Sequence, residues 1–218
     1  MSKFKIKPST LSSNQPINRV HGAHMQKILQ LVSAALQKFM AASARPGQDC
    51  YQRAVFAQSL LTKLGVDAKL VVGFTAWRIG NGDGDVIAHH PTSVGHGAGF
   101  MFHAWLEIGN NILDFTTYQL RLKAAMIDAI DGFKTNVVWC PEYLYVPKTS
   151  VSSYNLVRDK HAGLYHYQYD APTEAMLRSA AKPADPADIE QLWQIYQNPN
   201  AQVHVLLSSC EYIEDLAA

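Results

Sequence analysis

Three residues of this sequence carry the groups that acyl transfer by a thiol requires: Cys50, His103 and Asp114. A cysteine nucleophile needs a base that takes its proton, and that base needs an acceptor that orients its other ring nitrogen. A thiol, an imidazole and a carboxylate supply these roles. They lie far apart in the chain, so the chemistry depends on elements that bring them together.

The segment that begins at Cys50 is predicted to be a helix. Asp49 precedes it and is of a type that caps helices by accepting a hydrogen bond from a first-turn amide. Gly65 supplies a left-handed stop. Apolar residues recur between them at helical spacing: Ala54, Val55, Ala57, Leu60, Leu61 and Leu64. The positive end of the helix dipole favours a thiolate at Cys50, although the neighbouring Asp49 would partly oppose that charge.

The other two residues fall on a predicted hairpin. Residues 100–108 and 112–116 have the apolar and aromatic composition of strands, and Gly109-Asn110-Asn111 separates them with a turn signal. In a tight hairpin that turns near Asn110, positions 103 and 114 lie roughly opposite each other. Their side chains are therefore expected to share one face of the sheet.

These residues, with their neighbours, resemble the transglutaminase-like superfamily. That family places a cysteine at the start of a helix, then a His-Ala-Trp strand and an Asp-x-Thr strand, on a fold similar to papain-like peptidases. The resemblance covers about residues 46–117, a third of the chain. The matching residues are Cys50, Ala54, Leu60-Leu61, Leu64-Gly65-Val66, Ala68-Lys69-Leu70-Val71-Val72-Gly73-Phe74, His103-Ala104-Trp105-Leu106-Glu107-Ile108 and Leu113-Asp114-Phe115-Thr116.

The resemblance implies a role for each residue of the triad. Cys50 would be the nucleophile, His103 the base and then the acid, and Asp114 the residue that orients the imidazole. The substrate would be a peptide or another amide, attacked to give a thioester. The Cys50 backbone amide is a candidate oxyanion donor, Gln48 is a weaker candidate for the second donor, and Trp105 is expected to be core or a wall beside His103.

Other functions on the same fold stay open. Arylamine N-acetyltransferases share the triad logic on a related fold, and a binding or assembly protein could keep the fold without turnover. Crosslinking transglutaminase activity is less favoured, because nothing in the sequence indicates an amine-acceptor site or large accessory domains. The stretch from His103 to Asp114 is also shorter than the family usually shows, so the hairpin must be tight.

The rest of the chain is predicted to complete one α+β domain, with the nucleophile helix packed on an antiparallel sheet as in papain-like and transglutaminase-like cores. Residues 1–16 are expected to be an N-terminal arm, and 17–218 a single catalytic domain. The remaining predicted elements are a helix at 17–42, a strand at 68–79 with a possible bulge at Gly73, a long connection at 80–99, a helix at 118–130, a strand at 135–146, a strand at 164–169, a helix at 185–198 and a short element at 203–207.

Composition excludes several classes of partner. The chain has 218 residues, 19 basic and 18 acidic, and a formal charge of +1, so nothing points to nucleic acid or to an anionic membrane. No apolar run is long enough to cross a bilayer, and no secretory signal follows the basic N-terminus. The chain has three cysteines and no export signal, which indicates reduced thiols and predicts a cytoplasmic location. Cys140 and Cys210 lack catalytic companions and are expected to be structural or incidental.

A histidine-rich segment inside the 80–99 connection is a candidate metal site. His89, His90 and His96, with Asp83 and Asp85, are ligand types that zinc accepts, but no second pair has recognisable spacing. We therefore predict no metal and no cofactor. A loop that gates the substrate is the better functional use of this segment, and plain disorder is the alternative. Farther on, the alternation in residues 165–169 predicts a half-exposed strand face rather than a ligand site.

Overall fold

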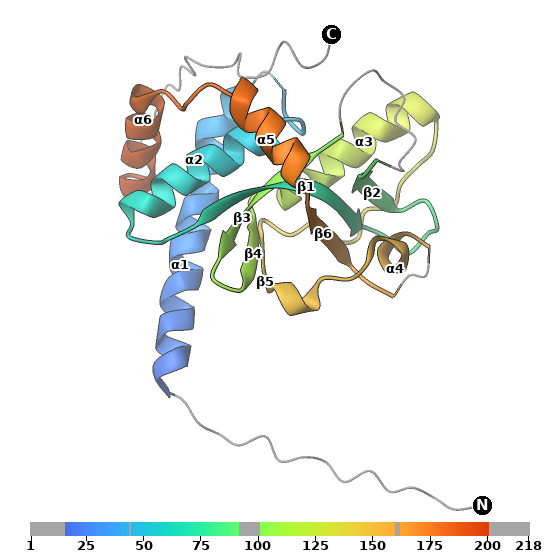
Figure 1. Ribbon diagram of the computed structural model, residues 1–218, viewed down its shortest axis with the longest axis horizontal. Helices are drawn as coiled ribbons and strands as arrows, with labels where there is room; N and C mark the ends of the chain where they lie inside the picture. The colour runs from blue at the N-terminus through green and yellow to red at the C-terminus, as the bar shows by residue number, and fades with distance from the viewer. Residues whose placement is uncertain (1–15, 44, 92–100, 160–161, 201–218) are drawn as a thin grey trace, which may run out of the picture.

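The computed structural model describes residues 16–43, 45–91, 101–159 and 162–200. It has an α+β fold in which helices surround a curled antiparallel sheet (Figure 1). The helices are α1 (Pro16–Phe39), α2 (Cys50–Lys63), α3 (Leu120–Asp131), α4 (Tyr154–Arg158), α5 (Ala171–Ala180) and α6 (Pro186–Gln197), with short 3-10 turns at 40–42, 117–119 and 148–150. The strands are β1 (Lys69–Arg78), β2 (Val86–His89), β3 (His103–Ile108), β4 (Asn111–Asp114), β5 (Leu144–Pro147) and β6 (Tyr165–Tyr169).

Strand β1 is the centre of the sheet, and β2, β3 and β6 all pair with it in antiparallel fashion. Gly73 pairs with both β3 and β6, whereas Thr75 pairs with both β2 and β6. Because a strand has only two edges, β6 must occupy one of them while β3 and β2 follow each other along the other. The end of β2 and the start of β3 therefore meet near Phe74.

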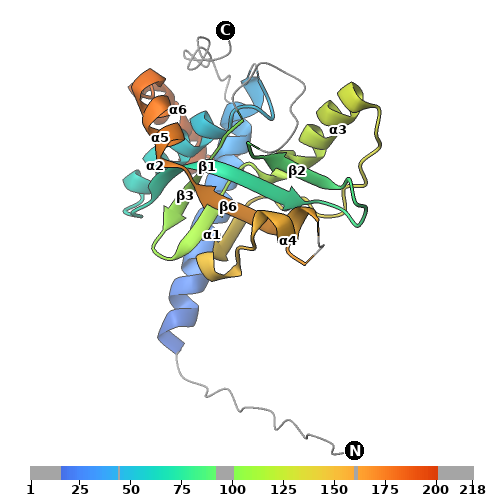
Figure 2. The ribbon, with the colours of Figure 1, turned by 45° about the vertical axis from the view of Figure 1, so that its right-hand side comes forward.

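Alternation along the strands divides the core between the two faces of the sheet. Leu70, Ala104 and Leu113 face a cluster that includes α1, α2, α5 and α6. Their neighbours in the chain face a second cluster that includes Leu120 and Ala124 of α3. Figure 2 shows α3 beyond β2, with α2, α5 and α6 gathered toward the other end of β1.

Several local predictions are confirmed. Helix α2 begins at Cys50 and ends before Gly65, which has a φ of +73°. The hairpin of β3 and β4 turns at Gly109-Asn110, because Ile108 pairs with Asn111. Helix α3 ends at Gly132 in the left-handed conformation. The strand at 164–169 and the helix at 185–198 are present with boundaries within about one residue of those predicted.

Other local predictions are wrong. The 80–99 connection contains strand β2, and most of 135–146 is irregular, with the Val138 and Trp139 amides donating to the Ile79 carbonyl. Gly73 marks a close approach instead of a bulge, because a Cβ there would lie 2.0 Å from the Gln168 carbonyl oxygen. Helices α4 and α5 were not predicted.

Two predictions fall wholly or largely outside the described residues. The short element at 203–207 is one of them, and the arm at 1–16 is described only at Pro16, where α1 begins. Within the described ranges, no helix is both long and apolar enough to span a membrane.

Candidate active site

The structure brings Cys50, His103 and Asp114 into one buried cluster. Cys50 is the first residue of α2, which packs against β3, and His103 is the first residue of β3. Asp114 ends β4, the partner of β3 in the hairpin. These side chains are 6%, 0% and 1% exposed respectively. Interactions among them therefore act in a medium where water screens charges weakly.

His103 and Asp114 form a direct hydrogen bond, with 2.9 Å between the imidazole Nε2 and the carboxylate Oδ2. Leu106 pairs with Leu113, so the same register continued by one residue sets Trp105 opposite Asp114. His103 lies two residues from Trp105 on the same face. The two groups are thus diagonal neighbours rather than directly opposite, and their side chains meet across that diagonal.

Asp114 is held in place by three other donated hydrogen bonds. Its Oδ1 accepts from the Thr116 amide at 2.8 Å and from the Thr116 hydroxyl at 2.7 Å. Its Oδ2 accepts from the Tyr167 hydroxyl at 2.8 Å. Burial raises the pKa of this carboxyl, but His103 and Thr116 more than offset it and lower the pKa to about 2. Asp114 is therefore ionised at neutral pH and fixed in orientation.

Since Nε2 of His103 is taken by Asp114, Nδ1 is the nitrogen left for the Cys50 thiol. Nδ1 is buried and has no hydrogen bond of good geometry within the described residues, yet Cys50 and His103 are close enough to shift each other's pKa. The attraction between a thiolate and an imidazolium does not need ideal hydrogen-bond angles. A thiol and an imidazole in this relation can exchange a proton.

The two pKa values move in the directions that favour an ion pair. Burial raises the pKa of the Cys50 thiol, but the adjacent His103 imidazole, with Lys123 and the Ala104 amide, more than offsets burial and lowers it. Burial lowers the pKa of His103, but Asp114 and then Cys50 more than offset that and raise it. Both shifts favour a thiolate beside an imidazolium.

Asp49 does not cap α2 as predicted. It occupies the N-cap position, but its side chain accepts no amide hydrogen bond there. Its carboxylate instead binds the Arg53 guanidinium at 2.9 Å, and the Gln119 amide donates to it at 3.2 Å. Because Arg53 neutralises Asp49, the carboxylate next to Cys50 adds little net negative charge beside the thiol.

Tyr167 connects the site to β6, the strand that pairs with the other edge of β1. Its hydroxyl donates to Asp114 and accepts from the Trp77 indole Nε1 at 2.9 Å. The prediction of a half-exposed strand face holds for β6 only in part, because Tyr167 is 8% exposed and Tyr169 is 51% exposed. No local signal separates these tyrosines, since only the tertiary structure decides which of them reaches Asp114.

We expect Tyr167→Phe to destabilise the protein by about 1–3 kcal/mol, because it leaves the buried Trp77 N–H without an acceptor and removes one donor from Asp114. Urea unfolding at pH 7 measures this change. Tyr169→Phe is the matched control on the same strand and should shift stability by no more than about 0.5 kcal/mol. Equal losses in the two variants would contradict the role assigned to the Tyr167 hydroxyl.

Two groups near the triad were not predicted as site residues. Lys123 of α3 is 5% exposed, and its Nζ lies 3.3 Å from Nε2 of His89. The His89 ring stacks on His103, with 5.7 Å between centroids and 22° between planes. This stacking follows from the sheet, because β2 ends where β3 begins. A lysine on the buried face of α3, between Leu120 and Ala124, was the signal available in the sequence.

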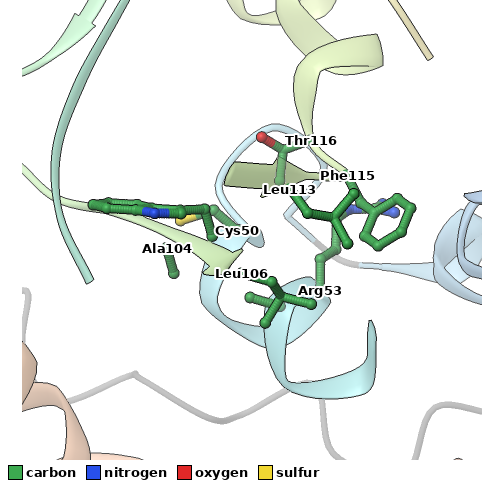
Figure 3. Close-up of a pocket in the computed structure, with 9 residues that line it drawn as sticks. Cys50, Arg53, Ala104, Leu106, Leu113, Phe115 and Thr116 are labelled. Atoms are coloured by element: carbon green, nitrogen blue, oxygen red, sulfur yellow. The ribbon is translucent and has the colours of Figure 1, made fainter. Parts of the chain in front are cut away.

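Of the two predicted accessory residues, Gln48 is exposed and Trp105 is buried. The side chain of Gln48 makes no hydrogen bond with the described residues. It therefore lies outside the buried cluster of Cys50, His103 and Asp114. Trp105 is 2% exposed and stacks on His103 with 13° between planes. It also lines a cavity of about 10 Å³ beside Cys50, which has room for roughly one water molecule (Figure 3).

The described candidate metal ligands have other contacts. His90 stacks on Tyr154 with 3.9 Å between ring centroids, and Asp85 accepts hydrogen bonds from the Gly82 and Asn136 amides. In the part of the chain that the structure describes, no three His, Cys, Asp or Glu side chains are arranged to hold a metal ion. His96 and the second half of the predicted gating loop lie outside the described residues.

Of the two remaining cysteines, the structure describes only Cys140. Cys140 is half-buried, and its thiol donates to the Thr117 and Tyr118 carbonyls at 3.4 and 3.3 Å. Cys210 lies outside the described residues. Cys140 therefore provides an internal reference thiol in the same protein.

Comparison with known proteins adds information on the fold alone. No protein-family model matches the chain, and no curated protein matches its sequence. A crystal structure described as "genomics APC5867" is similar, with a TM-score of 0.54 and 16% sequence identity over 84% of this chain and 83% of that one. At this identity the likeness concerns the arrangement of helices and strands and carries no activity with it.

Proposed function

We propose that this protein is a cysteine-dependent acyl-transfer enzyme of the peptidase or amidase type, with a transglutaminase-like, papain-related core. One observation carries the proposal. A thiol at the start of a helix lies close enough to a buried imidazole for each to shift the other's pKa, and Nε2 of that imidazole binds a carboxylate with a pKa of about 2. The family resemblance of residues 46–117 supports the same assignment.

The reaction would proceed in two halves. The Cys50 thiolate attacks the carbonyl carbon of an amide, a C–S bond forms, and the carbonyl electron pair moves onto oxygen. The tetrahedral intermediate collapses as the C–N bond breaks, and the His103 imidazolium gives its proton to the leaving amine. Neutral His103 then takes a proton from water, which attacks the thioester and releases the acid and the Cys50 thiolate.

The surrounding groups would serve these steps without reacting themselves. Asp114 keeps Nδ1 of His103 directed at the sulfur and stabilises the imidazolium. The Cys50 amide lies in the first turn of α2, where N–H groups lack helical acceptors, so it is our candidate oxyanion donor. Gln48 remains a weaker candidate for the second donor. The substrate would be a peptide or another amide, and the cytoplasmic location belongs to this proposal as well.

A second candidate is a binding or assembly protein that has lost turnover. The observation in its favour is the burial of Cys50, since the cavity beside the sulfur among the described residues holds about one water molecule. A substrate carbonyl needs more room than this. The two candidates differ in whether a covalent acyl group ever forms on Cys50.

Trapping of the acyl-enzyme tests this difference. The full chain is mixed with a panel of p-nitrophenyl esters and peptide p-nitroanilides, quenched in acid and analysed by mass spectrometry. We expect an acyl mass on Cys50 and release of p-nitrophenol from the esters or p-nitroaniline from the anilides. Both signals should be lost in Cys50→Ala but not in Cys140→Ser. Absence of acylation at Cys50 across the panel, with folded protein, favours the binding candidate.

A further inference from the structure

A buried lysine without a carboxylate partner lies beside the proposed triad. No carboxylate of the described residues is within ion-pair distance of the Lys123 ammonium, which instead contacts His89 and the face of the Trp77 ring, 5.4 Å from its centroid. Lysines are almost never buried to this extent unless their charge is compensated. Burial lowers the pKa of the Lys123 ammonium, whereas the negative charges of Cys50, Asp114 and Asp49 oppose that shift. These anions are therefore the groups of the site that can compensate a charged Lys123.

The fold places Lys123 close to the loop that leads into Cys50. Gly47 has a φ of +86°, and a Cβ built there would be 3.6 Å from Lys123 Cγ and 3.4 Å from Met126 Sδ. The backbone just before Cys50 thus packs on the lysine stem. A side chain at position 47 would be strained by the backbone and would crowd this contact.

Charged and titratable groups face Lys123 from several elements. They are Asp49, Cys50 and Arg53 from α2 and its N-cap, His89 from β2, His103 from β3 and Asp114 from β4. Asp49 and Arg53 neutralise each other. Burial, together with the charges of Lys123 and His103, holds the pKa of His89 well below its ordinary value, so His89 is neutral and can accept from Lys123.

The charges that remain are those of the triad. A Cys50 thiolate, a His103 imidazolium and an Asp114 carboxylate sum to −1, and one ammonium brings the total to zero. We propose that Lys123 is an electrostatic positioning residue that supplies this fourth charge and stabilises first the Cys50 thiolate and then the oxyanion that replaces it. This inference rests on the proposed function.

The same balance holds through the proposed reaction. In the tetrahedral intermediate the oxyanion takes over the negative charge of the thiolate, and the sum stays zero. In the thioester the thiolate charge and the imidazolium proton are both gone, which leaves Asp114 and Lys123 as opposite charges. A buried site that never holds net charge avoids a large desolvation cost at each step.

The pH profile of Cys50 alkylation tests the proposal. Iodoacetamide is applied to the full chain, and the rate at Cys50 is followed by peptide mass spectrometry. We expect Lys123→Met to raise the apparent pKa of Cys50 by about one unit or more and to slow alkylation at pH 6 by about tenfold or more, with the high-pH plateau unchanged. Arg121→Met removes an exposed charge from the same helix and should leave the profile unchanged.

The outcomes separate this inference from the proposed function. A low apparent pKa in the wild type that stays the same in Lys123→Met overturns the inference and leaves the proposed function standing. An ordinary thiol pKa in the wild type overturns both. If Lys123→Met does not fold, ¹⁵N-lysine NMR replaces it, and the Lys123 ammonium should titrate at lower pH in Cys50→Ser than in wild type. Equal titration in the two proteins would overturn the inference.

Discussion

Replacing His103 by glutamine is expected to slow alkylation of Cys50 at pH 6 by about a hundredfold. Burial alone raises the pKa of the Cys50 thiol, and His103 is the largest of the influences that lower it. Nearby charges of opposite sign shift pKa values by about 1–3 units, so loss of the imidazole should remove most of the thiolate present at pH 6. Iodoacetamide kinetics between pH 5 and 10 measure the change.

Two controls accompany this variant. His24→Gln removes an exposed histidine of α1 and should leave the rate at Cys50 unchanged. The rate at Cys140 in the His103→Gln protein should also stay unchanged, which shows that the fold is retained. Cys50 alkylation that proceeds at the wild-type rate without His103 would remove the imidazole as the partner of the thiol.

Asp114→Asn is expected to lower the free energy of unfolding at pH 7 by about 3 kcal/mol, since it breaks a buried charge pair and leaves donors of Thr116 and Tyr167 competing for fewer acceptors. The folded pKa of about 2 lies below the ordinary 3.8, so the carboxylate stabilises the native state above pH 4. This contribution, about 2 kcal/mol, is lost as the pH falls from 4 to 2.

Urea unfolding of Asp114→Asn and wild type at pH 7, 4 and 2.5 checks both the size and the sign. The difference between the two proteins should shrink between pH 4 and pH 2.5. Asp67→Asn, an exposed residue with no such network, should change stability by less than about 0.5 kcal/mol. A difference that grows toward low pH would contradict the ionised, hydrogen-bonded state assigned to Asp114.

Local patterns were sufficient for the elements that carry the triad. The start of α2 at Cys50 and the turn at Gly109-Asn110 are set by residues within a few positions, so their types can be identified without tertiary contacts. The sequence predicted that His103 and Asp114 lie roughly opposite each other, and the observed register makes them diagonal neighbours. Both arrangements keep the two side chains on one face of the sheet and within reach of each other.

The other parts of the site depend on contacts that no local pattern contains. Tyr167 reaches Asp114 because β6 pairs with the far half of β1, and His89 stacks on His103 because β2 continues the edge that β3 begins. Lys123 is buried by the Gly47 backbone and by its contact with His89. Asp49 had a strong local role as a cap, yet Arg53 offered its carboxylate a charged partner instead.

The pH dependence of Cys50 alkylation in the unaltered protein is the most direct measurement of whether thiol, imidazole and carboxylate act as one unit. We expect the alkylation rate at Cys50 to reach its plateau below the pH range in which an ordinary thiol ionises, and to exceed the Cys140 rate at pH 6. Titration of Cys50 as an ordinary or raised thiol, with rates no faster than at Cys140, would contradict the assignment.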